Sequence, residues 1–262
     1  MDRDLHVAHA DLDETHWWFV ARMRIVASVL DRFDVRGPVL DIGCGAGGLL
    51  PVLARYGHVT AIETEPSTAA QAAQRNPGAD VIVGWIPDAV ADVPAVRLAT
   101  AFDVIEHLDD DVATLAAVGE KVGAGGHVVV TVPALPWLWS EHDDANQHRR
   151  RYTRRTLEDS MTAAGLVVEH ISYFNMLLLP MVAIARLLER LRPGGGGGDF
   201  DRSLGPFDRL LERVFASERH LVPRVRLPLG VSLIAVAHPQ VGLRPVKTSS
   251  EPPVHEDLTG FV

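Results

Sequence analysis

The chain has 262 residues, of which 47% are hydrophobic and 23% charged, so it can bury a sizeable core and wholesale disorder is excluded. Its 25 basic and 34 acidic residues give a formal charge of −9, which argues against a protein that binds duplex nucleic acid by neutralising phosphates. Cys44 is the only cysteine, so a disulfide-stapled fold and a cysteine zinc site are excluded. With neither a secretory signal nor an apolar run of spanning length, we expect a small-molecule protein of the reducing cytoplasm.

The first half of the chain alternates helices and strands. Apolar residues three or four positions apart predict a helix over 16–33, which ends within 34–38. Strands are predicted over 39–42, 58–63 and 80–83, and helices over 49–54 and 67–75, the second of them capped by Ser67. Such alternation is typical of a parallel, doubly wound sheet of the α/β class.

The second half continues the pattern and adds an insertion. Strands are predicted over 96–102, 127–132, 166–173 and 231–237, and helices over 111–122 and from an N-cap at Thr153 to 164. About 57 residues separate the last two strands, far more than a hairpin needs. They contain an apolar, then amphipathic stretch over 177–191, a flexible linker at Gly194–Gly198, and a second amphipathic helix with Phe207, Leu210, Leu211, Val214 and Phe215 on one face.

Four units follow from this pattern. Residues 1–36 form an N-terminal cap region, and residues 37–175 together with 227–240 form the sheet domain. Residues 176–226 form the helical insertion, which covers an apolar acceptor, pairs two subunits into a homodimer, rests on a membrane surface or packs against the sheet. Residues 241–262 have the composition of a disordered tail.

A glycine-rich turn follows the first strand. The glycines of residues 43–48 permit a tight turn and close approach of backbone N–H groups to a ligand, and Glu63, ending the second strand, can accept both hydroxyls of a ribose. The same glycines also satisfy the dinucleotide spacing, so they do not by themselves separate the nucleotide types. Asp41 does, because a carboxylate beside the turn repels a pyrophosphate and suits a ligand with an ammonium or sulfonium group.

At these residues the sequence resembles the class I S-adenosylmethionine-dependent methyltransferases. Residues 39–47 resemble the first motif of that family, Glu63 its ribose-binding acid, and 102–108 and 133–153 the segments after the fourth and fifth strands. The resemblance covers roughly residues 14–175 and the last strand. It implies a Rossmann-like, seven-stranded sheet of order 3-2-1-4-5-7-6 with the last strand antiparallel, and an enzyme that uses S-adenosylmethionine (SAM).

The resemblance also implies a cofactor-binding set. The glycine turn would contact the methionine part of SAM and Glu63 its ribose, while Trp85 or Ile86 would pack on the adenine, although the acid that many relatives carry there is missing. Trp18 and Arg22 belong to a segment that resembles a capping helix, and Arg22 either pairs with the methionine carboxylate or is a solvated helix arginine. The full implied set is Trp18, Arg22, Asp41, Gly43, Cys44, Gly45, Gly47, Glu63, Thr64, Trp85, Ile86, Phe102, Asp103 and His107.

Histidines are the candidate catalytic residues. Methyl transfer from a sulfonium needs a base only if the acceptor is protonated. His107, just past the fourth strand, and His142 and His148, in the loop after the fifth, are candidates because imidazole titrates in the required range. The alternatives are that Glu106-His107 is a framework element and that the loop histidines are buried, hydrogen-bonded residues. His142, Asp143 and His148 also have ligand chemistry, but their spacing is loose and we expect no metal.

The acceptor is less defined. Arg149–Arg151, Arg154 and Arg155, with Tyr152, either grip an anionic substrate or form a solvated helix start. We therefore predict methyl transfer to oxygen or nitrogen of a small or amphipathic, lipid-like and possibly anionic acceptor, without nucleic acid and with peripheral membrane contact through the insertion as an option. The alternatives are a non-catalytic module that keeps this fold and, further off, a nicotinamide-dependent oxidoreductase.

Overall fold

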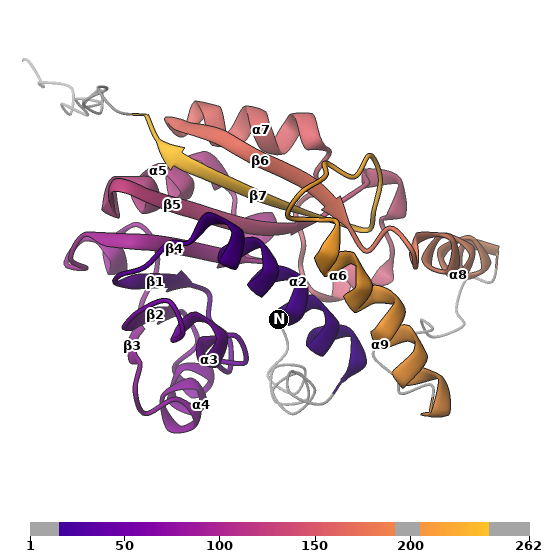
Figure 1. Cartoon of the computed structure of the whole chain (residues 1–262), viewed down its shortest axis with the longest axis horizontal. Helices are drawn as coiled ribbons and strands as arrows, with labels where there is room; N and C mark the ends of the chain where they lie inside the picture. The colour runs from indigo at the N-terminus through magenta and orange to yellow at the C-terminus, as the bar shows by residue number, and fades with distance from the viewer. Residues whose placement is uncertain (1–15, 192–204, 241–262) are drawn as a thin grey trace, which may run out of the picture.

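The computed structural model of the chain describes residues 16–191 and 205–240 (Figure 1). The strands are β1 (Val39–Ile42), β2 (Val59–Glu63), β3 (Asp80–Val83), β4 (Val96–Phe102), β5 (Val122–Pro133), β6 (Leu166–Phe174) and β7 (Ser232–Pro239). They form one sheet in the order β3-β2-β1-β4-β5-β7-β6, in which β7 alone runs antiparallel to its neighbours. The predicted sheet order and the antiparallel last strand are confirmed.

Helices cover the sheet. They are α2 (Trp17–Phe33), α3 (Leu50–Leu53), α4 (Pro66–Arg75), α5 (Asp111–Lys121), α6 (Glu141–Ala145), α7 (Arg154–Ala163), α8 (Leu179–Leu191) and α9 (Asp208–Ser217), with short 3-10 turns such as η2 (Ile105–His107) and η5 (Glu218–His220). The central strands β1 and β4 are buried over almost their whole length, as expected for parallel strands covered on both faces. The carboxyl ends of these two strands lie at the point where the strand order reverses, which is where open α/β sheets bind ligands.

Three local predictions are wrong. Helix α4 begins at Pro66 with Glu65 as N-cap rather than at Ser67, because proline has the backbone angle of a first helical residue and lacks the N–H that such a residue leaves unbonded. Strand β5 starts at Val122 and runs through Gly125 and Gly126 instead of starting after them, so α5 ends one residue early, at Lys121.

The second amphipathic helix of the insertion is confirmed as α9, but its apolar face is divided. Phe215 is fully buried, whereas Phe207 and Leu210 are exposed. Helix α9 lies beside α2 (Figure 1), where Glu212 accepts a hydrogen bond from Arg24 at 2.6 Å and the ring of Phe215 lies 6.2 Å from that of Trp18. The insertion therefore covers the N-terminal helix rather than only the sheet.

Some predictions fall outside the described residues: the start of the cap region at 1–15, the linker at 194–198 and the tail at 241–262. Within the ranges 16–191 and 205–240, none of the helices is long and apolar enough to cross a membrane.

Candidate functional site

A cavity of about 700 Å³ opens at the carboxyl ends of β1, β2, β4 and β5. Its volume lies in the range of pockets that hold small molecules. Of the predicted cofactor-binding set, nine residues line it: Trp18, Gly43, Gly45, Glu63, Thr64, Trp85, Ile86, Asp103 and His107. The remaining five do not line it: Arg22, Asp41, Cys44, Gly47 and Phe102.

The carboxylate of Glu63 fixes the glycine turn. One oxygen accepts a hydrogen bond from the N–H of Gly45 at 3.0 Å, and the other accepts from the N–H groups of Thr64 and Glu65 at 2.8 and 3.0 Å. The side chain is buried at the cavity wall. The acid at the end of β2 thus both shapes the turn after β1 and presents a charged acceptor to a ligand.

Gly43 and Gly45 are needed in the turn for different reasons, close packing and an open backbone. Gly43 and Gly45 have positive φ angles of 66° and 55°, which side chains disfavour. A Cβ on Gly43 would lie 2.6 Å from a methyl group of Val104, so glycine is needed there for packing against the segment after β4. A Cβ on Gly45 would meet nothing within 4 Å, and the residue lines the cavity. This open backbone fits a ligand lying directly on the turn.

Asp41 lies beneath the turn. Its carboxylate accepts a hydrogen bond of 2.6 Å from the hydroxyl of Thr100, and burial raises its pKa to about 7. Asp41 is buried within β1 and does not line the cavity, so its role in cofactor binding stays a prediction.

Arg22 is buried in α2, so the solvated alternative is wrong. Its guanidinium forms an ion pair with Asp103 and donates a hydrogen bond of 2.8 Å to the hydroxyl of Thr131, and it lies 5.5 Å from the ring centre of Trp18. Asp103 follows β4 and lines the cavity, while Thr131 belongs to β5. The N-terminal helix is therefore tied to the sheet at the cavity, and the pairing of Arg22 with a ligand carboxylate stays a prediction.

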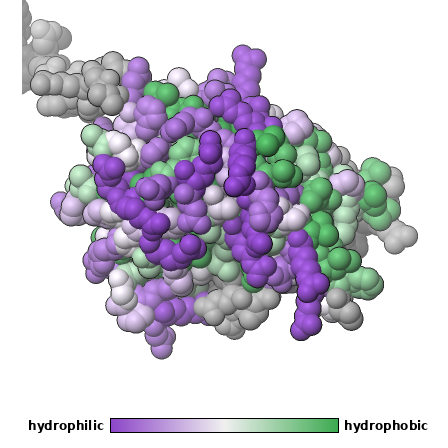
Figure 2. Space-filling view, viewed as in Figure 1, coloured by the Kyte–Doolittle hydropathy of each residue, from purple (hydrophilic) through white to green (hydrophobic). Residues whose placement is uncertain are grey.

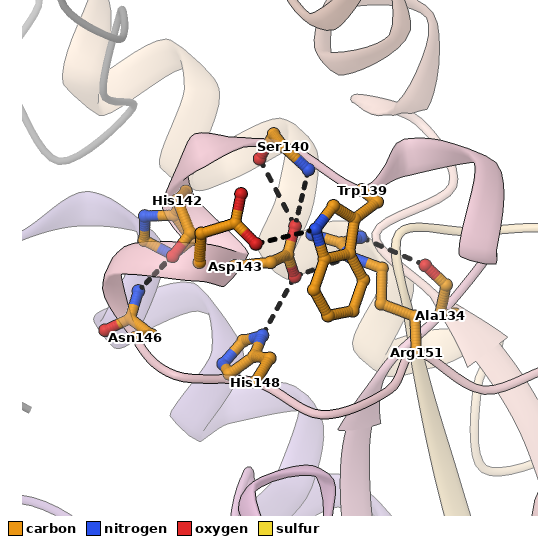
Figure 3. Close-up of polar contacts among 9 residues, drawn as sticks. Ala134, Trp139, Ser140, His142, Asp143, Asn146, His148 and Arg151 are labelled. Carbon is orange, nitrogen blue, oxygen red and sulfur yellow. Dashed lines mark hydrogen bonds and ion pairs between the residues drawn. The ribbon is translucent and has the colours of Figure 1, made fainter.

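The buried Asp143 holds His148 in the loop after β5 (Figure 3). Asp143 accepts hydrogen bonds from Nδ1 of His148 at 2.8 Å, Nε of Arg151 at 2.7 Å and the N–H of Ser140 at 2.9 Å. Burial opposes ionisation of Asp143, but the hydrogen bonds from His148 and Arg151 outweigh it and hold its pKa well below the ordinary value. In a neutral imidazole, donation from Nδ1 of His148 to this carboxylate leaves the lone pair on Nε2, where a proton or a ligand can bind.

The three candidate histidines meet at the cavity wall. The rings of His107 and His148 lie 4.7 Å apart and those of His142 and His148 6.5 Å apart, and all three line the cavity. Burial and the nearby His148 lower the pKa of His107 to about 4, so this imidazole is neutral at pH 7. Nε2 of His142 lies 3.1 Å from the amide nitrogen of Asn146. We call these three residues the histidine cluster.

Glu106 is a functional candidate that the sequence analysis passed over. Its side chain is fully buried, and neither carboxylate oxygen has a hydrogen-bond partner within the described part of the chain. Burial, followed by the charge of Asp103, raises its pKa well above the ordinary value. Its place beside His107, directly after a strand, was the available signal, but the sequence analysis considered Glu106 only within a possible framework element.

The arginine cluster mainly binds other parts of this chain. Arg150 pairs with Asp111 at 2.9 Å and Arg151 with Asp143 at 2.7 Å, while Arg149 pairs with Asp109 at 2.7 Å. A solvated helix start describes the exposed Arg155 but not the arginines that hold the loops around the cavity in place. Arg149 and Arg151 also line the cavity, so contact with an anionic substrate stays a prediction.

Comparison with known proteins gives a family. Residues 16–171 match the family described as "Methyltransferase domain". Over 99 residues, 36% of this chain, the sequence is 35% identical to a ubiquinone biosynthesis O-methyltransferase of Xylella fastidiosa strain 9a5c, and this match spans 40% of the relative's length.

Solved structures share the fold at low sequence identity. A SAM-dependent methyltransferase from Clostridium acetobutylicum ATCC 824 has a TM-score of 0.55 at 10% identity and covers 88% of this chain and 94% of its own. A SAM-dependent methyltransferase from Archaeoglobus fulgidus has a TM-score of 0.53 at 17% identity, and the match covers 82% of this chain and 93% of that protein. Geranyl diphosphate C-methyltransferase from Streptomyces coelicolor A3(2), solved with S-adenosyl-L-homocysteine, has a TM-score of 0.53 at 15% identity. The match covers 80% of this chain and 74% of that protein. The chain therefore belongs to the methyltransferase-domain family, and it has the fold of these SAM-dependent methyltransferases.

Proposed function

We propose that the protein transfers the methyl group of SAM to a hydroxyl oxygen of an amphipathic small molecule. The observation that carries this proposal is His148, which the buried Asp143 orients in the cavity wall beside His107. A hydroxyl must lose its proton to become a good nucleophile, so an oriented imidazole is more useful for oxygen than for an amine. The O-methyltransferase named among the relatives supports the same acceptor chemistry.

The proposed methyl transfer accounts for each bond and for the proton of the acceptor. SAM supplies a methyl group that is already activated on a sulfonium. The acceptor oxygen would form a bond to the methyl carbon as the carbon–sulfur bond breaks, the hydroxyl proton would pass to His148, and S-adenosyl-L-homocysteine would be released. In this proposal the glycine turn and Glu63 hold the donor, with Trp85 and Ile86 against its adenine.

Replacement of Glu63 by alanine should weaken the binding of S-adenosyl-L-homocysteine by about 1 to 3 kcal/mol, because charged hydrogen bonds to the ribose are lost. Calorimetric titration measures this, and thermal unfolding of the same variant reports any damage to the turn. Glu65→Ala is the matched control, since the backbone N–H of Glu65 is retained and its side chain lies outside the cavity lining. An unchanged affinity in Glu63→Ala would rule out the ribose role.

The acceptor side of the cavity favours an apolar body. Leu178, Met181 and Val182, at the start of the insertion, and Trp17 and Phe19, in α2, all line it. Apolar walls with a few convergent polar groups are typical of sites that bind a mostly apolar molecule in one orientation.

The test of the proposed function uses labelled SAM with a matched set of acceptors: a long-chain alkylphenol, the corresponding alkylaniline and the phenol without its chain. We expect methylation of the alkylphenol, weaker reaction of the short phenol and none of the aniline. Methylation of the aniline alone would overturn oxygen as the acceptor, and equal reaction of both phenols would overturn the role of the apolar wall.

The insertion exposes an unusual share of the apolar side chains of the described residues. Figure 2 shows apolar residues along the edge where α8 and α9 lie. Exposed arginines are interspersed with them in a chain whose net charge is −9, while Glu212 and Glu218 are not exposed. We define the insertion surface as the apolar residues Leu177, Ile184, Leu187, Leu188, Phe207, Leu210, Leu221, Val225 and Leu229 with the arginines Arg209, Arg213, Arg219, Arg224 and Arg226.

We propose that this insertion surface rests on an anionic membrane, from which the amphipathic acceptor enters the cavity. Apolar side chains mixed with cationic ones are typical of helices that lie in a membrane interface. The same segment lines the cavity through Met181 and Val182, so a lipid-like acceptor would pass along one helix.

Leu187→Glu should abolish sedimentation with phosphatidylglycerol vesicles, because a charge replaces an apolar side chain that is already exposed and does not pack in the core. Val167→Glu, on the exposed face of β6, is the control that should sediment like the native protein. Equal sedimentation of both variants, or none of the native protein, would contradict the membrane proposal. A native dimer that Leu187→Glu dissociates would assign the surface to a second subunit instead.

A further inference from the structure

We infer that Glu106, His107 and His148 form a binding site for a divalent cation in the cavity wall. The inference rests on the proposed function in one respect only, that the acceptor hydroxyl would complete the coordination of the cation. The three residues come from two places in the fold, the 3-10 turn after β4 and the loop after α6, so their spacing along the chain gave no signal.

The geometry is close to that of a metal site. One ligand atom from each residue, a carboxylate oxygen or an imidazole nitrogen, lies within 4.8 Å of the other two. Bonds of about 2.1 Å to a cation allow two ligands to lie at most about 4.2 Å apart. Each of the three ligand atoms therefore needs to move toward the others by well under an ångström, and small side-chain rotations provide this movement.

Glu106 supplies the strongest reason for a cation. Its carboxylate is fully buried and has no hydrogen-bond partner within the described residues. A buried carboxylate without partners is costly, and a bound ion is one of the few groups that removes the cost. The nearby guanidinium groups are already engaged, because Arg22 pairs with Asp103 and Arg151 with Asp143.

The surroundings of His148 match those of a metal ligand. An imidazole that binds a metal through one nitrogen commonly donates the other N–H to a carboxylate, which fixes its tautomer and its orientation. Asp143 provides this contact to Nδ1 of His148 and is itself held by Arg151 and Ser140 (Figure 3). Nε2 is the nitrogen left for the cation.

The three ligands indicate which cation would bind and how it would act on the acceptor. Two imidazoles and one carboxylate suit zinc or a similar transition metal better than magnesium, which prefers oxygen ligands. Three protein ligands leave a coordination position open, as catalytic sites do, and all three residues line the cavity. A hydroxyl in that position loses its proton to water at lower pH, so His148 then acts as a ligand and the cation activates the acceptor. The sequence analysis predicted that no metal binds, but it weighed only His142, Asp143 and His148, which lie in one loop.

The test measures cation binding without donor or acceptor. Metal-free protein is titrated with Zn²⁺ and with Mg²⁺ by calorimetry, and with Co²⁺ by visible absorption, which reports imidazole coordination. We expect one Zn²⁺ per chain, Mg²⁺ binding weaker by at least about 100-fold, and at least about 10-fold weaker Zn²⁺ binding in Glu106→Gln and His148→Ala. His58→Ala is the matched control, because His58 forms a pair with Asp80 on the surface, away from the cavity.

Two results would overturn the cation site: no stoichiometric Zn²⁺ binding by the native protein, or equal binding by the native protein and both variants. Thermal unfolding checks that each variant is folded, and His107→Ala replaces Glu106→Gln if burial of the amide prevents folding. The outcome is independent of the proposed function. A protein that binds Zn²⁺ through these residues but methylates only the aniline would retain the site and lose the oxygen acceptor.

Discussion

Replacement of His148 by alanine is expected to lower kcat by about 10²- to 10⁴-fold and to leave the affinity for S-adenosyl-L-homocysteine unchanged. The reason is positional: His148 lies in the loop after β5, whereas the glycine turn and Glu63 lie at the ends of β1 and β2. The variant removes the group that Asp143 orients, whether it takes the hydroxyl proton or holds a cation. Single-turnover methylation of the best acceptor, together with calorimetric titration, separates these two effects.

His142→Ala is the matched control for that experiment. His142 lies in the same loop and lines the same cavity, but its Nε2 lies within hydrogen-bond distance of the amide of Asn146, whereas His148 contacts the buried Asp143. We expect this variant to keep most of its kcat. If His148→Ala lost affinity for S-adenosyl-L-homocysteine, His148 would belong to the donor-binding site instead. If the native and His148→Ala enzymes had equal kcat values, His148 would have no role in the reaction.

Replacement of Glu218 by alanine is expected to lower the free energy of unfolding by about 2 to 5 kcal/mol, because a buried and a partly buried backbone N–H lose their acceptor. Glu218 is fully buried in η5 and accepts hydrogen bonds from the N–H of Asn175 at 2.6 Å and of Leu177 at 2.8 Å. It thereby joins the end of the insertion to the chain that leaves β6. Urea unfolding gives the free energy, and an unchanged slope with denaturant shows that the change lies in the native state.

Glu212→Ala gives the comparison within the same segment. Glu212 pairs with Arg24 at the protein surface, and such pairs contribute about 0 to 1 kcal/mol. Similar losses for the two variants would mean that the backbone hydrogen bonds of Glu218 are not what stabilises this junction.

Local patterns predicted the elements better than they predicted contacts. Thr153 is the N-cap of α7 as expected, because an N-cap depends on the residues of one helical turn. Glu218 was not singled out, because its partners lie more than forty positions earlier and only the folded chain brings them together. The burial of Arg22 was missed for the same reason, since its partner Asp103 directly follows β4 and its partner Thr131 lies in β5.

The candidate site was predictable where it follows the ends of strands. Gly43, Gly45, Glu63 and His107 all line the cavity because the carboxyl ends of parallel strands meet at one edge of the sheet. The roles of His142 and His148 were not separable in the sequence, since both lie in one loop and only His148 pairs with Asp143 in the structure.

Helix α2 connects the two halves of the cavity. It contributes Trp17, Trp18 and Phe19 to the wall, and it is joined to α9 by the pair of Arg24 with Glu212 and by the contact of Trp18 with Phe215. A displacement of α2 wide enough to exchange a nucleotide must either carry α9 along or break these contacts. An opening of the cavity at α2 would therefore disturb the insertion as well.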